Sequence, residues 1–247
     1  MTTETSLPAA ARSAAARPAS PVRSGTSAWG RHLLVFLHVL SSLGWWAMGL
    51  AQLSFTLVAL RSTRDGALAA LQAAQHLDHT LLIYFANSAA YTGIMLAALT
   101  PWGLFRYWWV TVKFAFTVVL TVVGIALLGQ WRQGMIDATR DGAPGPDPLL
   151  VVSGVTATVT ALVLVTWVSI AKPWGRTGLR ARPAPRPAAR TYLLACAPPL
   201  LDYAVSLALG FPSPLLQLLT VLIYPAWRRV SAIRESHPTD HPHIGIT

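Results

Sequence analysis

The sequence carries little charge. Asp, Glu, Lys and Arg together make up 11% of its 247 residues, whereas an average soluble domain has about 25%. Hydrophobic residues make up 53% of the chain, and its mean hydropathy is positive. So few charges cannot cover a water-facing surface, which excludes an ordinary soluble domain.

Cysteine and catalytic motifs are also scarce. Cys196 is the only cysteine, so neither an intrachain disulfide nor a zinc site of several thiolates can form. The sequence has no Gly-x-x-x-x-Gly-Lys-Ser/Thr phosphate loop, no Gly-x-Ser-x-Gly elbow and no His-Glu-x-x-His pair. The apolar runs contain no pair of acids for general acid–base chemistry. We therefore expect that the protein is not an enzyme.

The net charge is +10, but the basic residues lie almost entirely between or outside the apolar runs. That placement is typical of the positive-inside pattern of membrane proteins and differs from the basic stripe of a nucleic-acid-binding protein. We expect the lipid bilayer, and not nucleic acid, as the partner of this chain.

Four long apolar runs are present, at residues 32–60, 77–99, 107–129 and 149–171. Each is long enough to cross a bilayer, which takes about 20 residues of helix. They predict an all-α, polytopic transmembrane helical bundle with four full spans, extending over residues 31–172. Segment 130–148 is expected to be an outside loop, because Asp141 to Pro148 is rich in helix-breaking residues.

Residues 192–228 are apolar but interrupted by Pro198, Pro199 and two further prolines at 211–214. The segment is too long for one span and too short for two full ones. We predict a C-terminal broken or re-entrant helix pair, with its non-helical backbone covered by protein or a water-filled cavity. An even number of crossings is the alternative.

Three polar segments flank these apolar parts. Residues 1–30 and 229–247 are predicted to be disordered cytoplasmic tails, and residues 173–191 a basic cytoplasmic linker. Arginines precede the first span and follow the fourth. Because four spans separate the two groups, both lie on the same side of the membrane. The positive-inside rule places that side in the cytoplasm. We expect a multi-pass protein of the plasma (inner) membrane with both termini in the cytoplasm.

Polar side chains recur at helical spacing within the predicted spans, so each helix has one polar or small face. Such faces meet in a bundle, either as ordinary helix packing or as a functional seam. The predicted intramembrane polar seam consists of His38, Ser41, Ser42, Gln52, Asn87, Ser88, Tyr91, Lys113, Thr117 and Asp202.

The ionisable members of this seam are the best functional candidates, because charges inside a membrane are costly. His38 and Lys113 both lie about six residues, or roughly 9 Å, inside the cytoplasmic ends of their helices, so we expect them to be neighbours. Two alternatives for Lys113 remain open. Its side chain can extend back to the interface beside Arg106, or it can pair with Asp202, the only acid in an apolar run.

Histidines provide a weak indication of a metal or haem site. His38, His76 and His79 are the candidates, and the last two are three residues apart on a predicted helix. They fall at the outer end of the second span, however, about half a membrane away from His38. A bis-histidine haem is therefore geometrically poor.

Residues 37–46, LHVLSSLGWW, resemble the first helix of small bacterial, mainly actinobacterial, four-helix integral membrane proteins that are distantly similar to the copper-resistance D type. The resemblance covers residues 32–172. It implies a multipass inner-membrane protein with a metal- or redox-related role. This chain lacks the Met- and His-rich outer sites that a copper path needs.

Three functions are consistent with these features. The first is passage or binding of a small solute or proton along the polar seam. The second is a membrane-anchored haem, metal or redox-handling subunit. The third is a structural partner subunit of a membrane complex, or a homo-oligomer.

Overall fold

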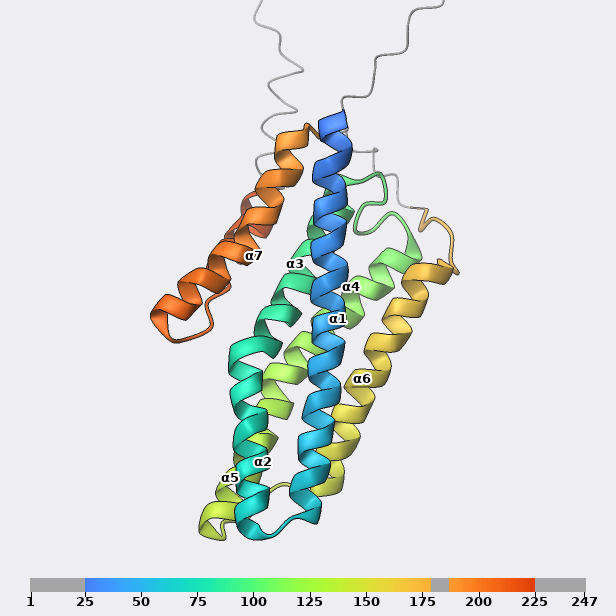
Figure 1. Cartoon of the computed structure of the whole chain (residues 1–247). Helices are drawn as coiled ribbons and strands as arrows, with labels where there is room; N and C mark the ends of the chain where they lie inside the picture. The colour runs from blue at the N-terminus through green and yellow to red at the C-terminus, as the bar shows by residue number, and fades with distance from the viewer. Residues whose placement is uncertain (1–24, 179–186, 225–247) are drawn as a thin grey trace, which may run out of the picture.

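The structure, a computed structural model, describes residues 25–178 and 187–224 (Figure 1). Within those ranges the regular elements are all helices. The two predicted terminal tails and the middle of the predicted basic linker fall largely outside the described residues.

Five rods of helix are long and apolar enough to cross a membrane, by length and composition, in the described part of the chain. Two of them contain a π-helical segment where the backbone locally adopts a wider turn. In chain order the elements are α1 (Gly25–Arg61), α2 (Arg64–Leu77), η2 (Asp78–Leu82), α3 (Ile83–Leu99), α4 (Trp108–Val123), η3 (Gly124–Leu128), α5 (Gly129–Asp141), α6 (Pro148–Ala171) and α7 (Ala189–Leu209).

The second and third rods are longer than the sequence predicts. The second begins at Arg64 instead of residue 77, and the third continues to Asp141 instead of ending at residue 129. Segment 130–148 is therefore not a loop, and only residues 142–147 lack helical structure. The reason is packing: Leu71 of α2 and Ile136 of α5 are buried in one apolar cluster. Amphipathic helices are stabilised mainly by such contacts.

Helix α1 is the central element, in contact with α2, α3, α6 and α7. Small residues allow its neighbours to approach closely. A Cβ atom at Gly44 would lie 2.5 Å from the Phe85 ring of α3, and one at Gly49 would lie 3.0 Å from Val159 of α6. Such contacts are typical of helix packing in membranes.

The outer surface of the bundle is apolar. Large hydrophobic side chains are exposed along α1, α4, α6 and α7, with Leu194 70% and Leu43 58% exposed. A soluble protein rarely exposes a continuous surface of this kind. These helices are therefore compatible with a multi-pass membrane protein.

The C-terminal segment forms a helical hairpin. Helix α7 begins at Ala189, includes Pro198 and Pro199 without ending, and stops at Leu209. With 21 residues it is a fifth candidate span. The sequence predicts that the proline pair interrupts this segment, but the helix continues through both prolines. The chain then turns, and a second helix, Leu215–Tyr224, begins.

The second helix of this hairpin packs back against α7. The carboxylate of Asp202 accepts hydrogen bonds of 2.9 Å from the backbone N–H groups of Leu216 and Gln217. Tyr224 packs against the cluster that contains Tyr192, near the start of α7. The two helices are thus antiparallel, and Figure 1 shows that α7 ends near the middle of the bundle's length.

Candidate functional site

The helical bundle contains two cavities at different levels. We call the end where α1 begins, at the top of Figure 1, the upper end, and the end of the α1–α2 turn the lower end. The upper cavity has a volume of about 380 Å³, and the residues lining it include His38, Lys113 and Thr117. The lower cavity has a volume of about 400 Å³, and the residues lining it include Gln52, Asn87 and Arg132.

His38 and Lys113 are hydrogen-bonded at the upper cavity. The Lys113 Nζ atom lies 3.4 Å from His38 Nε2 and donates to the Ser169 hydroxyl of α6 at 2.8 Å. The other ring nitrogen, Nδ1, lies 3.1 Å from the Ala89 carbonyl oxygen and 3.0 Å from Thr92 Oγ1.

These partners assign the tautomer of His38. A carbonyl oxygen only accepts, so Nδ1 carries the hydrogen and donates to Ala89. The lone pair of Nε2 is then free to accept from the Lys113 ammonium. The pair joins α1, α3, α4 and α6, and it creates a cation-bearing polar site in an otherwise apolar region.

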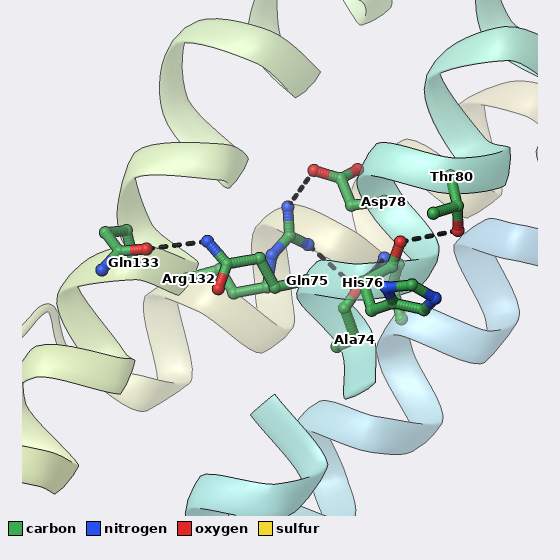
Figure 2. A network of polar contacts seen from close by, with 8 residues as sticks. Ala74, Gln75, His76, Asp78, Thr80, Arg132 and Gln133 are labelled. Atoms are coloured by element: carbon green, nitrogen blue, oxygen red, sulfur yellow. Dashed lines mark hydrogen bonds and ion pairs between the residues drawn. The ribbon is translucent and has the colours of Figure 1, made fainter. Parts of the chain in front are cut away.

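An ion pair between Arg132 and Asp78 dominates the lower cavity (Figure 2). Arg132 also donates to Gln52 Oε1 at 2.8 Å, and Gln52 in turn donates to the Ala74 carbonyl oxygen at 2.8 Å. Beside this group, Gln75 donates to Gln133. The network connects α1, α2 and α5, and it compensates the charge of the arginine.

Two π-helical segments border the lower cavity. Asp78 and Leu82 of η2, and Gly124 and Leu128 of η3, all line it. Short π-helical segments within α-helices occur frequently at functional sites. The lower cavity thus lies between the two places where the backbone of the bundle departs from α-helical geometry.

An apolar layer lies between the two cavities. Trp45, Ala86, Ala89, Leu120 and Leu162 form a buried cluster. Four of them line the lower cavity, and Ala89 lines the upper one. On α4 the lining changes from the upper to the lower cavity within one helical turn. Thr117 lines the upper cavity and Thr121, one helical turn further, lines the lower cavity, with the buried Leu120 beside it.

The predicted polar seam is therefore divided into two parts. His38, Lys113 and Thr117 lie at the upper cavity, and Gln52 and Asn87 at the lower one. The remaining predicted residues do not line either cavity; they are Ser41, Ser42, Ser88, Tyr91 and Asp202.

These remaining residues have local roles. Ser41 donates to the Leu37 carbonyl oxygen of its own helix, and the Ser88 carbonyl oxygen accepts from Thr92. Ser42 is half-buried. Tyr91 is buried in the cluster between α1, α3 and α7. The contacts of Ser41 and Tyr91 are typical of helix packing in membranes.

Of the two alternatives considered for Lys113, the pair with Asp202 is not formed. The side chain contacts His38 and Ser169. Ser169 lies near the upper end of α6, so extension of Lys113 toward the interface stays a prediction. Asp202 binds the backbone N–H groups at the start of the Leu215–Tyr224 helix. A carboxylate at a helix N-terminus satisfies unpaired N–H groups and the helix dipole, so Asp202 stabilises the hairpin.

The candidate metal-binding histidines do not converge. His38 lines the upper cavity, while His79 lines the lower one. His76 is exposed, and Figure 2 shows its ring turned away from Arg132. Among residues 25–178 and 187–224 no group of three or more His, Cys, Asp or Glu side chains is arranged to hold a metal ion.

The seam prediction missed Arg132, Thr92 and Ser169. Arg132 was placed in an outside loop, although Trp131, Met135 and Ile136 around it have the spacing of an amphipathic helix. That spacing was the signal that could have found it.

No family model, no curated protein and no solved structure matches this chain.

Proposed function

We propose that the protein mediates the passage of a small solute or a proton across the membrane, through the polar interior of its helical bundle. The observation that supports this function is the pair of cavities on opposite sides of one apolar layer. Each cavity contains polar seam residues, and the two share α1, α3, α4 and α6 as walls. Such an arrangement suits a solute path that is closed at the apolar layer and that a solute can enter from either end of the bundle.

The barrier is thin. Thr117 and Thr121 are four residues apart, a rise of about 6 Å along α4, yet they line different cavities. Rearrangement of Trp45, Leu120 and Leu162 would connect the cavities. The π-helical segments η2 and η3 lie next to this layer, and such segments occur frequently at functional sites.

The charge distribution supports an orientation. The described basic residues at the upper end are Arg31, Arg106, Lys172, Arg176 and Arg190, whereas Arg61, Arg64 and Arg140 at the lower end are accompanied by Asp65, Asp137, Asp141 and Asp147. The positive-inside rule places the upper end in the cytoplasm. On this basis the protein lies in the plasma membrane with cytoplasmic termini, and α7 and the Leu215–Tyr224 helix form a re-entrant pair from that side.

Single-cysteine accessibility tests the barrier. In a Cys196→Ser background, Thr117→Cys and Thr121→Cys form a matched pair on one helix. A charged, membrane-impermeant methanethiosulfonate reagent is added to reconstituted vesicles from one side at a time. We expect Thr117→Cys to react only from the upper side and Thr121→Cys only from the lower side.

Flux measurements test passage itself. Proteoliposomes loaded with pyranine report protons, and radiolabelled lactate, glycerol and choline represent anionic, neutral and cationic solutes. Leu120→Ala should increase the permeating flux several-fold, because it removes a large side chain from the barrier. If neither the natural protein nor Leu120→Ala exceeds protein-free vesicles for any of these species, passage is wrong.

The metal or redox role has less support, because its candidate ligands His38 and His79 lie at different cavities.

A further inference from the structure

The upper cavity holds positive charge without a compensating acid. Arg31, Lys113 and Lys172 line it, and none of the described residues that line it is Asp or Glu. The one ion pair in the described part of the chain, Arg132–Asp78, belongs to the lower cavity. Lys113 is partly buried, and a cation without a counter-charge is costly in a medium of low dielectric constant, so the upper cavity favours an anion.

Lys113 has a donor to offer such an anion. An ammonium group has three N–H donors. Lys113 directs two of them to Ser169 Oγ, at 2.8 Å, and to His38 Nε2, at 3.4 Å. Both acceptors are neutral, so the charge of the ammonium stays uncompensated. The third N–H donor is left for an acceptor inside the cavity.

The entrance to the cavity is also basic. Lys172, at the C-terminal end of α6, is exposed, and its Nζ lies 5.4 Å from the ring centroid of Trp102 and 6.0 Å from that of Trp109. These cation–π contacts hold the second ammonium beside the cavity. Arg31 and Trp102 are exposed as well, so the cavity opens at the upper end.

The walls suit an apolar body. Trp109 and Phe114 line the cavity together with small residues such as Ala90 and Gly93. A volume of about 380 Å³ falls within the range of roughly 300–1,000 Å³ typical of small-molecule sites. The cavity thus combines aromatic walls with cations at its depth and its mouth.

We propose that the upper cavity binds a small organic monoanion, with its anionic group on Lys113 and its apolar body against Trp109 and Phe114. This inference rests on the proposed passage function and names its substrate class. The headgroup of an anionic bilayer lipid presents the same chemistry, so the experiment must distinguish the two sources.

The test measures ligand binding to the full chain in mild detergent by ¹⁹F NMR. Three probes have the same fluorophenyl body, a similar size and different charge: 4-fluorobenzoate, 4-fluorobenzamide and 4-fluorobenzylammonium. We expect saturable line broadening of 4-fluorobenzoate, at least tenfold weaker binding of the amide, and no binding of the ammonium. Equal binding of all three probes to the natural protein would by itself overturn the inference.

Variants then locate the site. Lys113→Met should weaken 4-fluorobenzoate binding at least tenfold, whereas Lys113→Arg should retain most of it. Arg61→Met is the matched control, because it removes one positive charge from an exposed position at the lower end. Circular dichroism and gel filtration verify that each variant is folded. Unchanged binding in folded Lys113→Met would contradict the proposal.

A second arm separates the two sources of anion. In phosphatidylcholine nanodiscs, phosphatidylglycerol is titrated against bound 4-fluorobenzoate. Displacement that depends on Lys113 identifies the lipid headgroup as an occupant, and an absence of displacement identifies the soluble anion. If passage fails in the flux assay but 4-fluorobenzoate binds, the anion site stands alone. If flux occurs without anion preference, only this inference fails.

Discussion

The two cavities differ in the partners that each provides for a partly buried cation. At the lower cavity, Arg132 has a carboxylate partner in Asp78 and an amide partner in Gln52. At the upper cavity, Lys113 has only the hydroxyl of Ser169 and the imidazole of His38. Buried charges that serve stability are usually paired.

Under the proposal above, this difference separates a structural site from a binding site. The lower network connects three helices through compensated charge, so it contributes to the folded state. The upper site retains a charge that its own side chains do not neutralise. An anionic ligand can supply the missing counter-charge. We therefore expect the two sites to respond oppositely when one charged side chain is removed.

The largest effect is expected from Asp78→Asn. Arg132 and Asp78 are only 11% and 21% exposed, so the variant leaves a largely buried guanidinium without its counter-charge. We expect the free energy of unfolding to fall by about 3 kcal/mol. SDS-induced unfolding in mixed micelles, followed by tryptophan fluorescence, measures this change.

Arg132→Gln supplies the control for that prediction. The double variant Asp78→Asn/Arg132→Gln should recover part of the lost stability, because the uncompensated charge is gone, and the double-mutant cycle isolates the pair. A loss below about 0.5 kcal/mol for Asp78→Asn would instead place the pair among solvent-screened surface ion pairs.

A matched pair of glycines gives the next largest effect. A Cβ at Gly93 would lie 3.1 Å from His38 Cε1 in the upper cavity, whereas a Cβ at Gly124 in η3 has no neighbour within 4 Å. Alanine in a helix gains up to about 1 kcal/mol over glycine. We expect that gain for Gly124→Ala, but contact with the imidazole should cancel it for Gly93→Ala.

The resulting difference in the free energy of unfolding should be about 1 kcal/mol in favour of Gly124→Ala. The same micelle titration measures it. Equal stabilisation by both substitutions would mean that the His38 ring moves away at no cost. The hydrogen bonds of His38 to Ala89 and Thr92 would then not hold the ring in place.

The position of a residue along a predicted helix can be read from the sequence, and the prediction of the His38–Lys113 pair rests on this. The sequence predicts that His38 and Lys113 are neighbours, because each lies about six residues inside the start of its predicted span, 32–60 or 107–129. The structure brings them within hydrogen-bonding distance. The apolar runs were likewise visible, since a span of about 20 residues leaves a strong signal.

The remaining features depend on packing that no single segment encodes. Arg132 and Asp78 lie on different rods. The sequence predicts a loop where α5 lies, because the polar residues there outweigh Met135 and Ile136. The apolar layer was missed for a related reason. Helical periodicity shows which face of a helix is polar, but not where Trp45 and Leu120 from two helices meet and close the seam.

The smallest change in the free energy of unfolding is expected from Lys113→Met. The sign of this change matters more than its size. The substitution removes hydrogen bonds to Ser169 and His38, each contributing about 1 kcal/mol. It also removes the cost of an uncompensated, partly buried cation, which is of similar size. Methionine occupies nearly the same volume as the lysine side chain, so no cavity is added.

We therefore expect the free energy of unfolding of Lys113→Met to remain within about 1 kcal/mol of the natural protein, or to rise. This is the opposite of the result for Asp78→Asn at the lower cavity. Adding 4-fluorobenzoate should stabilise the natural protein and not the variant, because a ligand stabilises only the state that binds it. A loss above about 2 kcal/mol in the variant would mean that Lys113 supports the fold as Arg132 does, and the distinction between the two cavities would then disappear.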